Sequence, residues 1–382
     1  MKIGLLGLGV VGSGVMDLLA GRDDMQIARV LARRERPELG TLQTNSFDEI
    51  LSDPQIDTVV EVIGGMEPAH DYVLRALNAG KNVVSANKWM LSYHLEELLN
   101  AARANGVQLR FSASVGGGIP YLHNLARLRS TDEIESVSGI VNGTTNLILD
   151  TMQTVDIDFA EVLAQAQREG YAEADPSSDI DGLDARSKLC IMASVAFGKF
   201  VNPEDIQVEG IRRITSMDIA FFKKYDRVCR LIVSANRFRN GKISAYVEPT
   251  LVAKTAAEAS VRRNNNLIVL SAIRVGQQSF FGQGAGKYPT AANVVLDLSA
   301  VQAGVSPFPQ ISGHTEIDNS AEHRYFVRTT TRLGIPAKKL RCSGEANVYI
   351  TEPISIDRMH ALAASLRLRD ENLFFAGIRE NY

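Results

Sequence analysis

The fold of the first part of this 382-residue chain is decided by the stretch Lys2-Ile3-Gly4-Leu5-Leu6-Gly7-Leu8-Gly9-Val10-Val11-Gly12. It begins as a short apolar run that suits a buried strand, and after the glycines the apolar residues recur at helical intervals. The first spaced glycine allows a tight turn, the second lets a pyrophosphate approach the backbone, and the third lets helix and strand pack closely. The stretch therefore predicts a dinucleotide site formed by Gly7, Gly9, Val10, Val11 and Gly12.

The residues after the second strand distinguish NAD from NADP. We expect this strand from Gln26 to Ala32, and NAD-binding sheets carry an acidic residue at its end that binds the ribose hydroxyls. Here Arg33 and Arg34 stand at that point, and two guanidinium groups suit a 2′-phosphate, which favours NADP over NAD. A pair of solvated surface arginines would give the same pattern.

Strands and helices then alternate along the rest of the first part. Strands are expected at 58–63, 82–85 and 107–113, and helices at 47–51, 68–79 and 95–105. This alternation predicts an α/β fold with a doubly wound, Rossmann-type parallel sheet, which binds ligands at the carboxyl ends of its strands. Gly64 and Lys88 fall at such ends, so Lys88 is placed to meet a cofactor or a substrate carboxylate. A lysine just after a strand is also a common surface residue.

The densest chemistry in the chain lies in residues 170–188, which contain five carboxylates ahead of a lysine. Pro176 and the serines that follow it predict a loop, and the apolar spacing from Leu183 predicts a helix. Asp184 and Lys188 are four residues apart and therefore share one helix face. Such a pair behind a loop of carboxylates can grip an amine-bearing substrate and move a proton. The alternative is a solvated helix start with an ordinary surface ion pair.

The middle of the chain contains further polar and glycine-rich turns. Gly143 and Thr144 belong to a cluster of small polar donors at 139–146, although a plain turn would explain the cluster too. Longer alternating strands at 229–236, 243–252 and 267–275 predict a second, α+β domain with a mixed or antiparallel sheet. Residues 281–292 predict another glycine turn that opens a helix to about Ala300. This helix could return to the first domain and bring Gly284 near the cofactor.

The composition limits the classes of protein that fit. A hydrophobic share of 45%, a charged share of 22% and a net charge of −3 are typical of a globular protein and not of a nucleic-acid or membrane-surface binder. There is neither a membrane-spanning run nor a signal-peptide pattern, so we expect a cytoplasmic protein. Cys190, Cys229 and Cys342 are far apart and odd in number, which favours reduced, mostly buried thiols. The six histidines show no metal-ligand spacing.

Taken together, these motifs resemble those of the homoserine dehydrogenase family. The resemblance runs from residue 1 to about 303 and rests on motifs at 7–12, 61–65, 85–88, 115–120, 139–146, 170–188 and 282–290. It implies a homodimer with a nucleotide-binding domain and a catalytic and dimerisation domain. The implied reaction is the reversible reduction of aspartate 4-semialdehyde to homoserine by NAD(P)H, a step towards threonine and methionine.

The resemblance also implies roles for single residues. Lys188 resembles the family's proton donor and Asp184 its helix partner, while Glu173 matches a substrate-binding carboxylate and Lys88 a lysine between cofactor and substrate. The chemistry agrees, because hydride transfer to an aldehyde builds negative charge on its oxygen, which an ammonium group can stabilise and protonate. Burial that lowers the pKa of Lys188 would help this step. Glu173, Asp184 and Asp179 can hold the α-ammonium of the substrate.

One departure from the family concerns a metal ion. In relatives, a glutamate and three backbone carbonyls form an alkali-metal site, and the carbonyls match those of Val115, Gly117 and Ile119. The position of the glutamate is occupied here by Ser112. The loss of this carboxylate puts a sodium or potassium site in doubt.

We divide the chain into three segments. Residues 1–120, completed by a returning helix at about 285–303, form the dinucleotide-binding domain, and residues 121–284 the substrate-binding and dimerisation domain. Residues 304–382 form a small α/β tail with strands at 323–330, 346–351 and 373–378 and a helix at 356–366. Many relatives carry an ACT-type regulatory domain there that binds threonine, and the tail is interpreted as a divergent version of it, a structural cap or an added dimer contact.

Two other functions remain open. The first is an oxidoreductase of the same architecture that acts on another amino-acid aldehyde or ketone, and the pairing of Glu173 with Asp184 and Lys188 argues against it. The second is an inactive cofactor-binding regulatory protein. That function predicts the loss of Lys188 or Asp184, and both are present.

Overall fold

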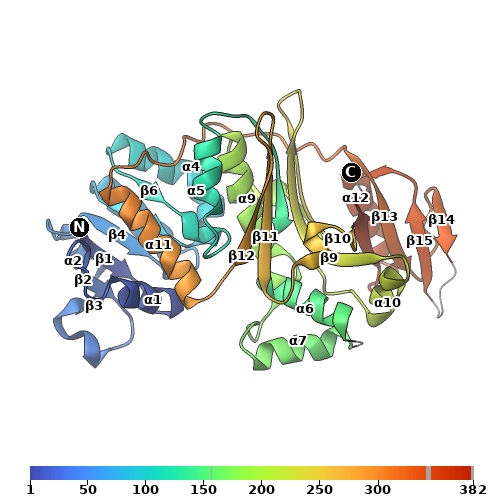
Figure 1. Ribbon diagram of the computed structural model, residues 1–382, viewed down its shortest axis with the longest axis horizontal. Coiled ribbons are helices and arrows are strands. Elements are labelled where there is room, and N and C mark those ends of the chain that lie inside the picture. The colour runs from blue at the N-terminus through green and yellow to red at the C-terminus, as the bar shows by residue number, and fades with distance from the viewer. Residues whose placement is uncertain (156, 341–345, 380–382) are drawn as a thin grey trace. The chain divides into compact units, whose positions relative to one another are not determined.

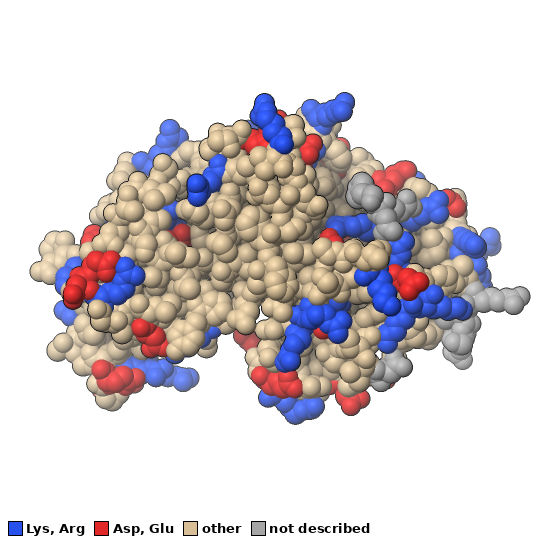
Figure 2. Space-filling view, in the orientation of Figure 1, with Lys and Arg blue, Asp and Glu red and all other residues tan. Residues whose placement is uncertain are grey.

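A computed structural model describes residues 1–155, 157–340 and 346–379 (Figure 1). Its contacts group the chain into two compact units. The first unit comprises residues 1–134, 190–203 and 272–314, and the second comprises 135–189, 204–271 and 315–382. Among the described residues, none of the helices combines the length and the hydrophobicity that a membrane span needs. Figure 2 shows basic and acidic side chains interspersed on the visible face, in keeping with the net charge of −3.

The first unit contains a six-stranded parallel sheet in the order β3-β2-β1-β4-β5-β6. The strands are β1 (Lys2–Leu6), β2 (Gln26–Leu31), β3 (Gln43–Thr44), β4 (Thr58–Glu61), β5 (Asn82–Ser85) and β6 (Leu109–Arg110). This is the strand order of a dinucleotide-binding fold, in which the chain changes direction between β1 and β4 and leaves a crevice at their carboxyl ends. The order confirms the predicted doubly wound sheet.

Helices cover this sheet and complete its core. They are α1 (Val10–Leu19), α2 (Phe47–Ser52), α3 (Ala69–Asn78), α4 (Lys88–Ala104) and α5 (Tyr121–Leu128). Helix α11 (Lys287–Gln302) comes from much later in the chain and packs beside α1 (Figure 1). Its Ala291, Val294 and Leu298 are fully buried in one cluster with Ile3 and Val15, so α11 is part of the hydrophobic core of the first unit.

Two predicted boundaries in the first unit were wrong. Helix α4 begins at Lys88, seven residues before the expected start at Leu95, because the side chain of Asn87 accepts a hydrogen bond from the Met90 amide and caps the helix. The strand expected at 107–113 is limited to β6 and gives way to a 3₁₀ turn at Ser112–Ser114. This early turn presents residues 112–119 to helix α11.

The second unit is built on a mixed sheet in the order β11-β7-β9-β10-β17-β13-β15-β14. These strands are β7 (Ile134–Ile140), β9 (Arg227–Arg237), β10 (Ile243–Ala253), β11 (Asn265–Ala272), β13 (Glu322–Thr329), β14 (Ala337–Leu340), β15 (Asn347–Thr351) and β17 (Phe374–Ile378). Its helices are α6 (Gly143–Thr154), α7 (Phe159–Arg168), α8 (Ser177–Ile180), α10 (Ser216–Lys224), α12 (Ile356–Arg367) and the start of α9 (Leu183–Phe197). Short strands β8 (Gln207–Val208) and β16 (Ile354–Ser355) flank β10 and β13. The predicted mixed sheet is confirmed.

The tail continues the sheet of the second unit. Strand β17 pairs in parallel with β10, and β13 pairs with β17. Tyr325, Met359 and Phe375 are buried in a cluster of the tail's own. The division into three segments stays a prediction, and the structure adds that β17 links the tail to the strands before it.

A further strand and the cysteines can also be compared with the predictions from the sequence. Strand β12 (Gly276–Gln283), whose residues alternate between exposed and half-buried, was not predicted. Cys190 and Cys229 are buried, as expected, whereas Cys342 lies outside the described residues.

Candidate active site

A buried ion pair stands at the start of helix α9. The Lys188 ammonium lies 2.7 Å from Asp184 Oδ2 and donates a second hydrogen bond of 2.7 Å to the carbonyl of Val141. The side chains of Lys188 and Asp184 are only 9% and 6% exposed. A solvated surface pair, the alternative left open by the sequence, is therefore wrong. Burying two charges is costly unless each is paired and hydrogen-bonded, as both are here.

The side chain of Asn142 organises the carboxylates around this pair. Its Nδ2 donates to Asp184 Oδ2 at 2.7 Å and to Asp179 Oδ1 at 2.6 Å. Its Oδ1 accepts from the Thr145 amide at 2.8 Å and so caps helix α6. One amide thus uses both of its hydrogens and its oxygen to join the end of β7 to α6, α8 and α9. The sequence marked this stretch as polar, but it gave no sign that Asn142 holds both carboxylates.

The remaining predicted substrate residues lie around this network in different ways. Burial, together with the negative charge of Asp184, raises the pKa of Asp179. Thr144 and Gly143 occupy the first turn of α6, and the Thr144 hydroxyl donates to the carbonyl of Tyr171 at 2.9 Å. Glu173 is exposed in the loop before α8, and its carboxylate makes no hydrogen bond to the described residues. Hydrogen bonds thus link Asp184 to Lys188 directly and Asp179 to Asp184 through Asn142.

The glycines after β1 form a cradle that fits a dinucleotide. Gly7 has φ +101°, and a Cβ on Gly12 would lie 2.1 Å from the carbonyl oxygen of Gly7. These two positions therefore require glycine for protein packing. A Cβ on Gly9 would meet no protein atom within 4 Å, so this side of the turn is open to a ligand. Val10 and Val11 begin helix α1 directly after it, and Val10 is 66% exposed.

A buried glutamate shapes the loop after β4. Glu61 Oε1 accepts from the amides of Ile63 and Gly64 at 2.9 and 3.2 Å, and Oε2 accepts from the Ser85 hydroxyl at 2.6 Å. Burial raises the pKa of Glu61. The adjacent β5 leads to Lys88, which is half-buried as the first residue of α4. Glu61 thereby fixes the backbone at Gly64, a role the sequence did not reveal.

A pocket of about 540 Å³ opens beside the end of β2, where a 2′-phosphate would bind. Arg33 lines it together with Arg36, which the sequence analysis had not singled out. The side chain of Gln43 holds the backbone there, since it donates to the Arg34 carbonyl at 2.9 Å and accepts from the Arg36 amide at 2.8 Å. The side chain of Arg34 is exposed and does not line the pocket.

Two of the three carbonyl groups expected to hold an alkali-metal ion already have a hydrogen-bond donor. The Nδ2 group of Asn293, on helix α11, donates to the carbonyls of Gly117 and Ile119, the latter at 3.1 Å. One turn further, Asp297 accepts from the amide and the hydroxyl of Ser112, both at 2.8 Å. Burial raises the pKa of Asp297 to about 6.

The residues at this position do not fit an alkali-metal ion. The carboxylate that relatives have at position 112 is absent. The carbonyls of Gly117 and Ile119 accept hydrogen bonds from the Asn293 amide, which takes the place of a cation. Val115 is buried in the same turn. A Cβ on Gly117 would lie 2.6 Å from the backbone of Gly284, so these two glycines pack directly against each other.

Comparisons with known proteins agree on one family. Residues 7–112 match the family model described as "Homoserine dehydrogenase, NAD binding domain", and residues 120–299 match the one described as "Homoserine dehydrogenase". The chain is 41% identical over 315 residues to the homoserine dehydrogenase of Bacillus subtilis, covering 79% of this chain and 72% of that one. It is 42% identical over 352 residues to that of Corynebacterium glutamicum, covering 86% and 78%.

A solved structure extends the similarity to the tail. The crystal structure of a homoserine dehydrogenase from Thiobacillus denitrificans superposes with a TM-score of 0.89 at 31% identity. The match covers 100% of this chain and 98% of that one. The architecture described above, including the described residues after 303, is therefore similar to that of the Thiobacillus denitrificans homoserine dehydrogenase.

Proposed function

This chain belongs to the homoserine dehydrogenase family, and we propose that the network of Lys188, Asp184 and Asn142 is where it binds and protonates its substrate. The reaction of the family is the NAD(P)-dependent, reversible reduction of L-aspartate 4-semialdehyde to L-homoserine. The observation that carries the assignment of the site is the buried Lys188 ammonium, held between a carboxylate and a backbone carbonyl. The replacement of Lys188 by methionine tests this assignment, because it removes the ammonium group and should lower kcat by about three orders of magnitude.

The cofactor cradle at Gly7, Gly9 and Gly12 fits a dinucleotide, whose nicotinamide, when bound, supplies the hydride that reduces the aldehyde carbon. Lys188 then stabilises the negative charge that builds on the aldehyde oxygen and gives it a proton. The Lys188 ammonium donates to Asp184 Oδ2 and to the Val141 carbonyl, and these two hydrogen bonds hold it in place. Asn142 acts as a positioning residue because it holds Asp184 in place.

The charges around Lys188 suit an amino-acid substrate. Asp179 and Asp184 together outweigh the single charge of Lys188 when both are ionised, so the network attracts the substrate's α-ammonium group. The first turn of α6, at Gly143 and Thr144, presents backbone amides that can bind the α-carboxylate. Glu173 lies in a surface loop close in sequence to Asp179, and its contact with substrate stays a proposal, as does the contact of Lys88 and Gly284 with the cofactor.

We expect NADP to be preferred to NAD because Arg33 and Arg36 line the pocket at the end of β2. Replacing Arg33 by alanine should lower kcat/KM for NADP by about tenfold to a hundredfold, since a hydrogen bond to a charged group contributes about 1.5–3 kcal/mol. The kcat/KM for NAD should stay unchanged, which provides the internal control. Steady-state kinetics with both cofactors at saturating homoserine measure this, and equal losses with both would contradict the role of Arg33.

The enzyme is also proposed to work without a bound sodium or potassium ion. The amide of Asn293 supports this, because it donates to two of the three carbonyls that were expected to bind the ion, those of Gly117 and Ile119. We expect the same kcat, within about twofold, in potassium, sodium or choline chloride at equal ionic strength, where general screening is constant. Activation of wild type by potassium relative to choline, by fivefold or more, would contradict the proposal.

A variant sharpens this test. Asn293→Asp replaces the amide donor with a carboxylate that faces the same carbonyls. The carboxylate and carbonyl oxygens are all hydrogen-bond acceptors and repel one another unless a cation lies between them. The melting temperature of this variant should therefore rise when potassium replaces choline, whereas that of wild type should not. Thermal unfolding in the two salts provides a readout that does not depend on turnover.

The assembly and location of the enzyme also remain proposals. The family resemblance supports a homodimer, which sedimentation equilibrium would show as the mass of two chains. A cytoplasmic location is supported by the ordinary composition and the reduced cysteines.

A further inference from the structure

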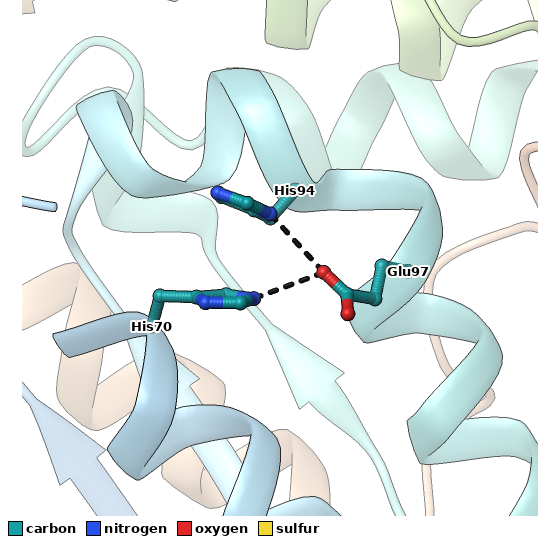
Figure 3. Close-up of side chains that lie close together, drawn as sticks. All are labelled: His70, His94 and Glu97. Atoms are coloured by element: carbon teal, nitrogen blue, oxygen red, sulfur yellow. Dashed lines mark hydrogen bonds and ion pairs between the residues drawn. The ribbon is translucent and has the colours of Figure 1, made fainter. Parts of the chain in front are cut away.

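Two histidines and a glutamate that the active site does not use come together between helices α3 and α4. His70 lies in the first turn of α3, and His94 and Glu97 lie three residues apart on α4, so they project from one face of that helix (Figure 3). The sequence gave no sign of this cluster, because His70 and His94 are 24 residues apart and meet only when the two helices pack. The packing of α3 against α4 therefore creates this cluster of His70, His94 and Glu97.

The nitrogen atoms of the two histidines are aimed at one point. His70 Nε2 lies 2.9 Å and His94 Nδ1 lies 3.1 Å from the same oxygen, Glu97 Oε2, and Figure 3 shows both contacts converging there. All three ligand atoms lie within 4.8 Å of one another. The two rings are stacked with their centroids 3.8 Å apart, which holds both nitrogens in this direction. An ion near the present position of the oxygen would be within easy reach of both rings.

The surroundings of His70 resemble those of a metal ligand. Its other nitrogen, Nδ1, lies 3.3 Å from Glu67 Oε1. Histidines that bind metals commonly donate their second N–H to a carboxylate, because this fixes the tautomer and raises the basicity of the binding nitrogen. With Nδ1–H donating to Glu67, the Nε2 lone pair of His70 points towards Glu97 and can bind a cation.

We propose that His70 Nε2, His94 Nδ1 and the Glu97 carboxylate bind one divalent transition-metal ion of the zinc type. Imidazole and carboxylate donors are the usual protein ligands of Zn²⁺, and water can complete a tetrahedral site. The Glu97 side chain is 49% exposed, so the carboxylate can draw back to a metal–oxygen distance and the ion can enter from solvent. The ion would tie the first turn of α3 to α4.

The consequence of binding is added stability of the first unit. Helix α4 begins at Lys88, and His94 lies about 9 Å further along the helix axis at 1.5 Å per residue. The metal would therefore not touch Lys88. Because the ion binds the folded protein and needs both helices in place, it should raise the melting temperature.

The test is a titration of tag-free, metal-stripped full-length protein with Zn²⁺ in competition with a chromophoric chelator. Wild type should bind one zinc ion with micromolar affinity that depends on these residues. His94→Gln keeps a donor for the contact with Glu97 but is a poor metal ligand, and it should weaken binding by at least tenfold. His70→Gln should do the same, while Glu67→Gln should weaken binding by about tenfold through the loss of the supporting carboxylate.

A matched control comes from another histidine of the first unit. His314 lies 3.6 Å from the carboxylate of Glu96, and among the described residues neither of them belongs to a group of side chains that could hold a metal, so His314→Gln should bind zinc like wild type. Zinc should also raise the melting temperature of wild type and of His314→Gln, but not that of His94→Gln. Equal zinc affinity in wild type and His94→Gln, or no binding to wild type below millimolar zinc, would overturn the proposal.

Discussion

Replacing Lys188 by methionine is expected to lower kcat for homoserine oxidation by about three orders of magnitude, since both acid–base catalysis and charge stabilisation at the oxygen are lost. Methionine has nearly the length of lysine without its charge, so it fills the same buried space. Asp184 keeps its hydrogen bond from Asn142 in this variant. The variant also removes the ion pair of the buried Asp184 carboxylate and should unfold more easily, so kcat is measured at the nicotinamide absorbance in protein that circular dichroism shows to be folded.

Two controls separate chemistry from structure. The shift in melting temperature that NADP causes should be the same in Lys188→Met as in wild type, because the glycine cradle of the first unit is untouched. Lys188→Arg keeps the positive charge, but its guanidinium cannot take up and release the proton, and it should also be nearly inactive. If Lys188→Met retained more than a tenth of wild-type kcat, Lys188 could not be the proton donor.

Replacing Gly12 by alanine is expected to destabilise the first unit and abolish cofactor binding. The new Cβ would lie 2.1 Å from the carbonyl oxygen of Gly7, and backbone atoms at both ends leave little room to relax. Overpacking of this kind typically costs about 1–3 kcal/mol of unfolding free energy. Chemical denaturation followed by circular dichroism measures this loss.

A neighbouring glycine provides the matched control. A Cβ on Gly9 would meet no protein atom within 4 Å, so Gly9→Ala should unfold like wild type. It should still weaken NADP binding, by about tenfold or more, because the added methyl group faces the position of the pyrophosphate. Wild-type NADP affinity in Gly9→Ala would show that the cofactor does not approach the turn at this residue.

The first unit was largely predictable because its signals are local. Its glycine spacing at 7–12 and its alternation of strands and helices depend only on neighbours in sequence. In the second unit, the pairing of Asp184 with Lys188 was predictable for the same reason, because the two residues are one helical turn apart. The start of α4 was missed because a single cap at Asn87, and not an apolar pattern, begins the helix.

The parts of the site that escaped prediction depend on residues distant in sequence. Asn142 is 37 and 42 residues from the two carboxylates it joins, and Asn293 is 176 residues from the carbonyl of Gly117. No periodicity or motif spacing encodes such contacts, which arise only when separate elements pack. Ser112 by itself indicated that the carboxylate ligand of a metal ion is missing. That the amide of Asn293, on α11, donates to the carbonyls of Gly117 and Ile119 became visible only in the structure.

The most direct test of the proposed reaction is the oxidation of L-homoserine by the purified wild-type chain, followed at the nicotinamide absorbance with NADP and NAD side by side. We expect reduction of the nicotinamide that depends on homoserine, is faster with NADP, and needs neither sodium nor potassium. The absence of turnover with both cofactors, in protein that still binds NADP, would contradict the assigned substrate and the proposed role of Lys188.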